Sequence, residues 1–377
     1  MINIKKKVIV GLSGGVDSAV AVKLLQDEGY LVEALFMRNW DSNLNNDILG
    51  NNLKGEVCPQ EIDYNDALQV ANQLNVKLHR VDFIKEYWDL VFKYFIEEYK
   101  KGRTPNPDIL CNKFIKFNMF LNYAIKNLGA DYIAMGHYAG VIYNSEKKEY
   151  QLLKAKDIDK DQSYFLSDLN QYQLSKTLFP LYNYLKTKIR EIAHENKLVV
   201  AQKKDSTGIC FIGERNFTKF LQNYIPNMPG DIIDIETNKV LGKHIGIMYY
   251  TIGQRKGLNL GGNKEPYYVA KKDIENKILY VSCLSEQKYL YSKKCIVKNF
   301  NWIINFQNNF GADKLNCNAK FRYRQEDVNV YVKILSGTND IEIYFTEPLR
   351  AITEGQQAVL YLNEVCLGGG VIDSVFS

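Results

Sequence analysis

The sequence predicts an α/β protein in which a parallel-sheet domain is followed by a small central domain and an antiparallel β-barrel. Three observations lead to this fold class. At 377 residues the chain exceeds one typical domain. In about the first 200 residues, short apolar runs alternate with helical patterns. From about residue 206 Gly and Pro become frequent, and after about residue 284 apolar and polar residues alternate with a period of two. We therefore expect domains at residues 1–205, 206–284 and 285–377.

The strands and helices of the first domain follow from hydrophobic periodicity. Apolar runs predict strands at residues 7–12, 31–37, 76–81 and 132–136, and apolar stripes predict helices at residues 19–25, 63–74, 86–99 and 115–128. This alternation implies a parallel sheet covered on both faces. Ligands of such sheets bind beyond the carboxyl ends of the strands.

The last domain shows alternating apolar and polar residues in several short segments. Strands are expected at residues 317–324, 328–335, 341–345 and 358–362. Short strands separated by turn signals suit a small antiparallel barrel or a sandwich, of which we take the barrel.

The composition excludes little but restricts the location of the protein. The net charge of +5 permits a nucleic-acid partner without indicating one. No stretch reaches the ~18 apolar residues that cross a bilayer. The apolar run at residues 8–12 is too short for a signal-peptide core. We expect a cytoplasmic protein that does not bind membranes.

The seven cysteines include no C-x-x-C pair, and the four histidines show no H-x-x-x-H spacing. This argues against zinc ribbons, ordinary iron–sulfur sites and histidine zinc sites, so we expect no site of these kinds. Each cysteine is then a small buried hydrophobe or a reactive thiol. We expect a structural role for five of them, which are Cys58, Cys283, Cys295, Cys317 and Cys366.

The strongest local motif lies between the first strand and the first helix. It consists of Gly11, Leu12, Ser13, Gly14, Gly15, Val16, Asp17 and Ser18. The glycines let the backbone approach an anion, the serines offer hydroxyls, and the helix points its N–H groups at the same place. Asp17 would hold Mg²⁺ or an adenylate-side group. The alternative is a glycine turn with Asp17 as a helix cap.

The loop is neither a Walker loop, since no Gly-Lys-Ser/Thr follows, nor a G-x-G-x-x-G fingerprint. It resembles the PP-loop of ATP pyrophosphatases, S-G-G-x-D-S, whose fold is that of the adenine nucleotide alpha hydrolases. The resemblance implies cleavage of ATP to AMP and pyrophosphate, with adenylation of an unreactive carbonyl oxygen.

Cys111 lies in a segment that is turn-forming up to Asp108 and then predicts a helix. In the first turn of that helix the dipole would lower the pKa of the thiol, and Lys113 adds positive charge. Asp108 is expected to cap the helix and to reach a ligand. The alternative is a buried cysteine that faces the core like Ile109 and Phe117.

Cys210 lies between Gly208 and Gly213. Basic residues flank it, as reactive cysteines require, namely Lys203, Lys204 and Arg215. The alternative is a small core residue between Ile209 and Phe211.

Both cysteine motifs resemble one family. T-P-N-P-D-x-x-C-N at residues 104–112 and D-S-T-G-I-C-F-I-G-E-R at residues 205–215 are similar to the tRNA-specific 2-thiouridylase (MnmA) family. Further matches lie at residues 36–41, 136–138, 159–166, 253–257, 322–325 and 364–370, so the resemblance covers essentially the whole chain. One departure is Phe114, where the family pattern has Glu; it affects helix packing but no chemical residue.

The resemblance implies a reaction. ATP bound at the loop adenylates the C2 oxygen of the wobble uridine of tRNA, and Met37 and Gly136 complete the nucleotide site. Cys210 carries sulfur as a persulfide, supplied by a relay protein or a cysteine desulfurase. Either the persulfide attacks C2 and Cys111 cleaves the mixed disulfide, or Cys111 first releases hydrosulfide. Both routes leave a Cys111–Cys210 disulfide for a reductant.

The resemblance also assigns the RNA contacts. Asp108 is the general acid–base, and Asn106 and Pro107 hold the flipped base. Further tRNA contacts are expected from His137, Lys160, Asp161, Gln162, Arg322, Tyr323 and Gln356. The substrates would be tRNAs that read Lys, Glu and Gln codons, and the enzyme a monomer.

Two other functions stay open on the residues alone. One is a PP-loop synthetase that adenylates a small metabolite, which needs no persulfide cysteine. The other is a catalytically inactive RNA-binding protein gated by a nucleotide. A cytidine-thiolating relative should carry C-x-x-C cluster ligands, which this sequence lacks.

Overall fold

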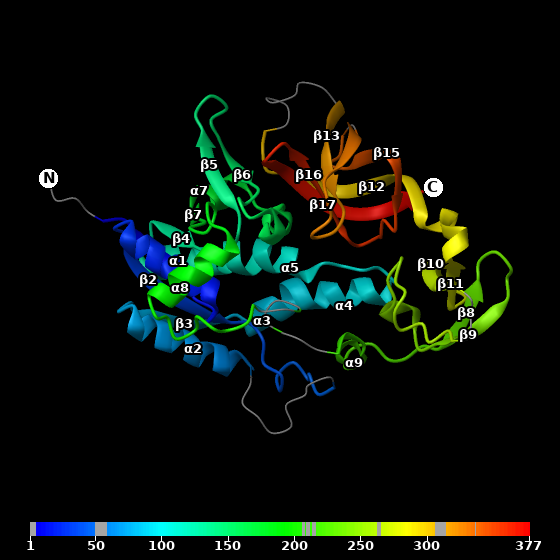
Figure 1. The fold of residues 1–377 in the computed structure, drawn as a ribbon, viewed down its shortest axis with the longest axis horizontal. Helices are drawn as coiled ribbons and strands as arrows, with labels where there is room; N and C mark the ends of the chain where they lie inside the picture. The colour runs from blue at the N-terminus through cyan, green and yellow to red at the C-terminus, as the bar shows by residue number, and fades with distance from the viewer. Residues whose placement is uncertain are drawn as a thin grey trace.

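The computed structural model describes residues 5–49, 59–205, 208, 212, 216–261, 265–305, 314–335 and 337–377. In Figure 1 the parallel-sheet domain lies at the left, the C-terminal barrel at the upper right and the central domain at the lower right. In the described part of the chain, no helix has both the length and the apolar character that a membrane span requires.

The N-terminal sheet is parallel, as predicted. It has five strands in the order β3-β2-β1-β4-β7, all paired in parallel. The strands are β1 (Lys7–Gly11), β2 (Leu31–Arg38), β3 (Leu78–Asp82), β4 (Tyr132–Ala134) and β7 (Thr177–Leu178). The short β7 is the one strand of this sheet that the apolar runs did not indicate.

Helices cover both faces of this sheet, which confirms that expectation. Val8 and Val10 of β1 pack into one core cluster, whereas Ile9 packs into the other. The first face carries α1 (Val16–Asp27), α2 (Pro59–Gln73) and α8 (Lys186–Glu195).

The second face carries two longer helical stretches. One comprises α3 (Ile84–Tyr87), the π-helical turns of Trp88–Phe92 and α4 (Lys93–Lys100). The other comprises α5 (Pro107–Leu110), the π-helical turns of Cys111–Phe120 and α6 (Leu121–Leu128). The sequence predicted a helix that starts at Asp108 and a further helix at residues 115–128, whereas the structure has one continuous helical stretch from Pro107 to Leu128.

The remaining elements of this part are a hairpin and short helices. They are β5 (Gly140–Asn144), β6 (Glu149–Leu153), the 3-10 turns Ile158–Lys160 and Ser163–Leu166, and α7 (Gln171–Ser175). The hairpin leaves the parallel sheet and joins the C-terminal one, since β6 pairs with β17.

The central domain is built on a four-stranded sheet in the order β10-β11-β8-β9. Its elements are α9 (Phe217–Gln222), β8 (Gly230–Asp234), β9 (Val240–His244), the 3-10 turn Ile247–Tyr249, β10 (Tyr267–Asp273), β11 (Ile278–Cys283) and the 3-10 helix Leu284–Leu290.

The last domain is a closed antiparallel barrel, which confirms the predicted fold class. The chain of pairings β12-β15-β14-β13-β16-β17 closes through a further β12–β17 pairing. The strands are β12 (Tyr291–Trp302), β13 (Lys314–Lys320), β14 (Val328–Ile334), β15 (Ile341–Arg350), β16 (Gln357–Leu362) and β17 (Val365–Phe376).

The cysteines of the barrel pack as predicted. Cys295 and Cys317 are buried in the barrel core, and Cys366 is buried in the core cluster that also contains residues of the first domain. Burial raises the pKa of the Cys317 thiol to about 12. Cys283 at the end of β11 is partly exposed. Cys58 lies outside the described residues.

Candidate functional site

The loop of residues 11–18 joins the carboxyl end of β1 to α1. Gly15 is the N-cap of α1, so Asp17 lies in the first turn and is not the cap. Gly14 has φ +75°, and a Cβ there would lie 2.3 Å from the Asp63 carbonyl oxygen, so only glycine fits. The two serines face each other, because Ser18 Oγ lies 3.1 Å from Ser13 Oγ and accepts from the Ser13 N–H at 3.2 Å.

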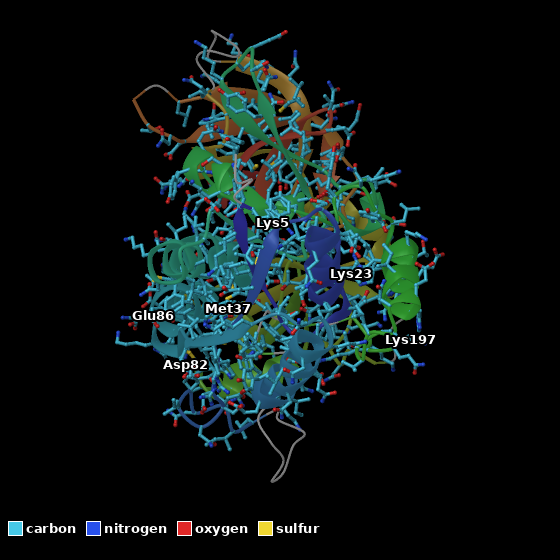
Figure 2. The ribbon with its side chains drawn as sticks, turned by 90° about the vertical axis from the view of Figure 1, so that its left-hand side faces the viewer. Lys5, Lys23, Met37, Asp82, Glu86 and Lys197 are labelled. Atoms are coloured by element: carbon cyan, nitrogen blue, oxygen red, sulfur yellow. The ribbon has the colours of Figure 1, made fainter. Side chains whose placement is uncertain are left out.

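The other predicted nucleotide residues lie at the ends of the neighbouring strands. Met37 is near the carboxyl end of β2, and Gly136 follows β4 by two residues. A Cβ on Gly136 would lie 2.9 Å from the Ser18 nitrogen, so this segment touches the start of α1. Figure 2 shows Met37 and Asp82 at the ends of the adjacent strands β2 and β3, with Lys23 marking α1. The fold thus gathers these residues at one edge of the sheet, where ligands of parallel sheets bind.

A lysine that the sequence analysis missed contacts the loop. Lys186, the first residue of α8, donates to both carboxylate oxygens of Asp17, at 2.7 and 2.8 Å. Its ammonium also lies 2.8 Å from Asp205 Oδ1. The Tyr138 hydroxyl donates to Asp17 at 2.9 Å. No local motif marks Lys186, because 169 positions separate it from Asp17.

Asp205 collects three cations beside the loop. Lys160 and Arg190 join Lys186 on its carboxylate, at 2.9 and 2.6 Å. Although burial raises the pKa of Asp205, the hydrogen bonds and charges of Lys186 and Lys160 hold it well below its ordinary value. At the carboxyl ends of the strands, positively and negatively charged side chains therefore form a connected network of ion pairs.

The Lys203 side chain links the loop to α2. Its ammonium donates to the Gly14 carbonyl at 3.1 Å and to Asp63 and Asp66 of α2 at 2.9 and 2.6 Å. Burial lowers the pKa of Lys203, but the hydrogen bonds of Asp66 and Asp63 raise it overall. Lys203 was expected in the surroundings of Cys210, and the structure pairs its charge with the two carboxylates of α2.

The helix that carries Cys111 begins at Pro107, with Asn106 as its N-cap. The Asn106 side chain accepts from the Asp108 N–H at 3.1 Å. Two expectations were therefore wrong. Asp108 is not the cap, and Cys111 follows the first turn instead of lying within it. Because dipole effects fall off within that turn, they favour the thiolate less than expected.

Cys111 is fully buried and shares a core cluster with Ile109 and Phe117. This is the packing that the alternative interpretation described, and access to its thiol requires movement of the chain. Cys210 lies outside the described residues, as do Ile209, Phe211, Gly213 and Arg215.

Two of the predicted RNA contacts in the first domain are buried. His137 is only 9% exposed, and within the described chain its Nδ1 has no hydrogen-bond partner. Burial, with the charge of Lys116, holds the pKa of His137 well below its ordinary value. Asp161 is 4% exposed and accepts from the Ala155 N–H and from the N–H and hydroxyl of Ser163.

The neighbours of Asp161 connect to the loop network. Lys160 pairs with Asp205, and Gln162 Oε1 accepts from the Tyr138 N–H at 3.0 Å. The structure thus brings these two residues close to Asp17, whereas Asp161 holds the turn that carries them.

The predicted barrel contacts lie near the Cys111 helix. The Tyr323 ring packs on Phe165 with centroids 4.4 Å apart, and Asn112 donates to the Phe165 carbonyl at 3.0 Å. Gln356 donates to the Thr104 carbonyl at 2.7 Å. One Arg322 nitrogen, Nη2, donates to the carbonyl oxygens of Ile252 and Ala351.

Family models match almost the whole chain. Residues 6–214 match the tRNA methyl transferase HUP domain, and residues 218–283 match the tRNA methyl transferase PRC-barrel domain. Residues 292–372 match the aminomethyltransferase beta-barrel domain.

Named relatives match it from end to end. The tRNA-specific 2-thiouridylase MnmA of Mycoplasma capricolum subsp. capricolum is 66% identical, over 98% of this chain and 99% of that protein. Its namesake in Mycoplasma mycoides subsp. mycoides is 65% identical over the same shares. A solved 4-thiouridine synthetase with RNA and ATP is similar at a TM-score of 0.33 and 16% identity, over 58% of this chain and 50% of that one, which supports no conclusion. From the family models and the relatives, the chain belongs to the tRNA-specific 2-thiouridylase family.

Proposed function

We propose that this protein thiolates the wobble uridine of tRNA at C2 and consumes ATP in doing so. One observation carries the proposal. In a chain 66% identical to a named 2-thiouridylase, an S-G-G-x-D-S loop lies at the sheet edge beside Met37 and Gly136. Uridine C2 carries a very poor leaving group, so ATP is needed to activate it.

ATP would bind with its phosphates on residues 11–18, where Gly14 and Gly15 allow close approach and α1 directs its N–H groups. The adenine would contact the backbone of Met37 and the segment of Gly136. Lys186 would turn from Asp17 and Asp205 towards the phosphates and neutralise the departing pyrophosphate.

Asp17 suits Mg²⁺, because this cation is commonly held by one or two carboxylates together with substrate phosphates. Its carboxylate is part of the loop and becomes available when Lys186 turns away. Bound there, Mg²⁺ would screen the phosphate charge.

In the adenylation step the C2 oxygen attacks the α-phosphorus of ATP and pyrophosphate leaves. A persulfide on Cys210 then supplies the sulfur, and AMP departs with the former C2 oxygen. In one order the terminal sulfur attacks C2, after which Cys111 attacks the Cys210 sulfur. In the other, Cys111 first releases hydrosulfide. Both orders end in a Cys111–Cys210 disulfide.

Asp108 would move the proton at the uracil edge, with Asn106 and Pro107 holding the flipped base. The tRNA would be held by Lys160, Gln162, His137, Arg322, Tyr323 and Gln356, with Asp161 supporting its neighbours. We propose tRNAs that read Lys, Glu and Gln codons as substrates, a relay protein or cysteine desulfurase as sulfur donor, and a monomeric enzyme.

The test is thiolation of unmodified tRNA with ATP, Mg²⁺ and a persulfide source, resolved on a gel that contains mercury. Wild type should produce a retarded band, and Cys111→Ser and Cys210→Ser should not. Cys283→Ser, at a partly exposed cysteine outside the site, should behave as wild type.

Failure would take recognisable forms. ATP cleavage without a retarded band, unaffected by Cys210→Ser, would support a small-molecule synthetase instead. Binding of tRNA without turnover of ATP would support an inactive RNA-binding protein.

A further inference from the structure

The segment before the Cys111 helix, residues 102–106, is held by both other domains. We call it the approach segment. It joins α4 to α5 below the barrel in Figure 1. It ends at Asn106, the N-cap of the helix that begins with Pro107 and carries Asp108 and Cys111. Its position therefore sets where that helix starts.

The central domain holds the start of the approach segment. Lys272 of β10 donates to the Gly102 carbonyl at 2.8 Å. Gly102 has φ +73°, and a Cβ there would lie 2.3 Å from Ile274 Cδ1, so the Ile274 side chain packs directly on the backbone of Gly102. Thr251 Oγ1 lies 3.3 Å from Thr104 Oγ1.

The barrel holds the middle of the approach segment. The Thr104 N–H donates to the Glu354 carbonyl at 3.0 Å, and the Thr104 carbonyl accepts from Gln356 at 2.7 Å. Gly355 between them has φ +87°, and a Cβ there would lie 2.9 Å from the Thr104 nitrogen. Both backbone polar groups of Thr104 are thus paired with one loop of the barrel.

Arg103 links the approach segment to the last strand of the barrel. Its Nη2 donates to Oδ1 of Asp373 at 3.0 Å and to the carbonyl of Asp373 at 3.1 Å. Its Nη1 lies 3.6 Å from Glu98 of α4, which is 4% exposed. Lys298 of β12 also pairs with Asp373, at 3.2 Å, but with the other carboxylate oxygen, Oδ2. A single nitrogen, Nη2, thus donates to two acceptors of Asp373, and this pair of hydrogen bonds fixes the position of the guanidinium against the last strand.

The barrel loop that contacts Thr104 is also tied to Arg322, a proposed tRNA contact. Arg322 Nη2 donates to the Ala351 carbonyl at 2.7 Å and to Thr353 Oγ1 at 3.0 Å. The same barrel loop, residues 351–356, therefore contacts both Arg322 and the approach segment.

We propose that Arg103 is a positioning residue, which through Asp373 holds the approach segment so that Asn106, Pro107 and Asp108 face the uridine only while the barrel is docked. The role of these three residues towards the base rests on the proposed function. The holding of the segment does not, and it is tested separately.

The first measurement is the alkylation rate of Cys111, followed by peptide mass spectrometry under reducing conditions. Cys111 is fully buried, so its rate reports opening of the helix start. Arg103→Ala and Asp373→Ala should raise that rate about tenfold. Lys298→Ala should not, and Cys317 in the barrel core should stay unreactive in every variant. Equal Cys111 rates in Arg103→Ala and wild type would overturn the proposal, whether or not the protein thiolates tRNA.

The second measurement is the steady-state rate of tRNA thiolation. Misplacement of the base-holding residues should lower kcat by about tenfold or more in Arg103→Ala and Asp373→Ala. KM for tRNA should change by no more than about twofold, because the proposed tRNA contacts outside residues 102–108 are kept. The double variant should be no slower than either single variant, because both remove one interaction. Arg103→Lys should keep part of the rate.

Other results would count against it. A raised KM with unchanged kcat, or a double variant that multiplies the two single losses, contradicts a positioning role. If Arg103→Ala does not fold, the alkylation rate and the thiolation rate are measured on Arg103→Lys and Asp373→Asn instead. Wild type that does not thiolate tRNA would overturn the proposed function, and the alkylation rates would still decide the role of Arg103.

Discussion

Single residues at the candidate site are defined by partners that lie far away in the sequence. Lys186 shares its charge between Asp17 and Asp205, and Lys203 divides its own between the Gly14 carbonyl and α2. In the proposed function Lys186 leaves these carboxylates and contacts the phosphates when ATP binds, so the loop would accept an anion although it contains Asp17.

At this scale we predict that Lys186→Ala abolishes tRNA-dependent formation of AMP. The variant removes the cation that would face the departing pyrophosphate, a loss that typically lowers kcat about 100-fold or more. The measurement is release of radioactive AMP from labelled ATP. Lys188→Ala provides the matched control, since Lys188 lies on the same helix, is 49% exposed and pairs with Glu191. Equal loss in both variants would show that α8 matters only for folding.

At the scale of elements, close approaches of backbone fix the nucleotide edge of the sheet. Gly14 touches α2 and Gly136 touches α1, so β1, β4 and two helices converge on one place. At both glycines the neighbouring helix lies closer than a Cβ atom would allow, so replacing either glycine must displace one of the two segments that touch.

We predict that Gly136→Ala weakens ATP binding while tRNA binding is kept. The added Cβ would lie 2.9 Å from the Ser18 nitrogen and would push away the first turn of α1, whose N–H groups are proposed to face the phosphates of ATP. Equilibrium dialysis with ATP measures the effect. Gly261→Ala is the control, because among the described residues no atom beyond its chain neighbours lies within 4 Å of its added Cβ. An unchanged ATP affinity for Gly136→Ala would contradict the assignment of the nucleotide site.

The strands were predictable where their side chains are buried and therefore have to be apolar. The runs that became β1, β2 and β4 are buried in the sheet, so their apolar character was visible in the sequence. The Cys111 helix was also predictable, since its expected start at Asp108 lies next to the observed Pro107, but its cap was not, because Asn106 provides the cap that was expected of Asp108. The phosphate loop could be identified from its motif. Its supports Lys186 and Lys203 could not, since only the fold brings them there.

At the scale of the whole molecule, the barrel and the first domain share structure. Leu152 and Leu153 of β6 pair with Cys366 and Val365 of β17, so the hairpin of the first domain extends the barrel sheet. Buried charges follow this seam, because Lys154 pairs with Asp327 and Lys320 lies 3.6 Å from the same carboxylate. No local pattern predicts such pairings, since about 200 positions separate the partners. The predicted domain boundaries stay predictions.

We predict that Lys154→Met destabilises the protein by about 2 kcal/mol, because it removes one partner of a buried ion pair. Lys154 is 9% exposed, so water cannot easily replace its charge. Guanidinium unfolding at neutral pH measures the change. Lys333→Met is the control, since Lys333 is 49% exposed and lies 4.0 Å from its partner Glu342. Equal stability of both variants would mean that the buried Lys154–Asp327 pair contributes no more to stability than the exposed Lys333–Glu342 pair.

The central claim is that ATP activates the C2 oxygen of the wobble uridine. The most direct measurement uses an anticodon stem–loop RNA with a heavy oxygen isotope at C2 of that uridine. The RNA is incubated with the protein, ATP, Mg²⁺ and a persulfide source, and AMP is then analysed by mass spectrometry. The account predicts that AMP carries the heavy oxygen, one atom for each 2-thiouridine formed. Unlabelled AMP, with the isotope still in the RNA or released to water, would contradict it.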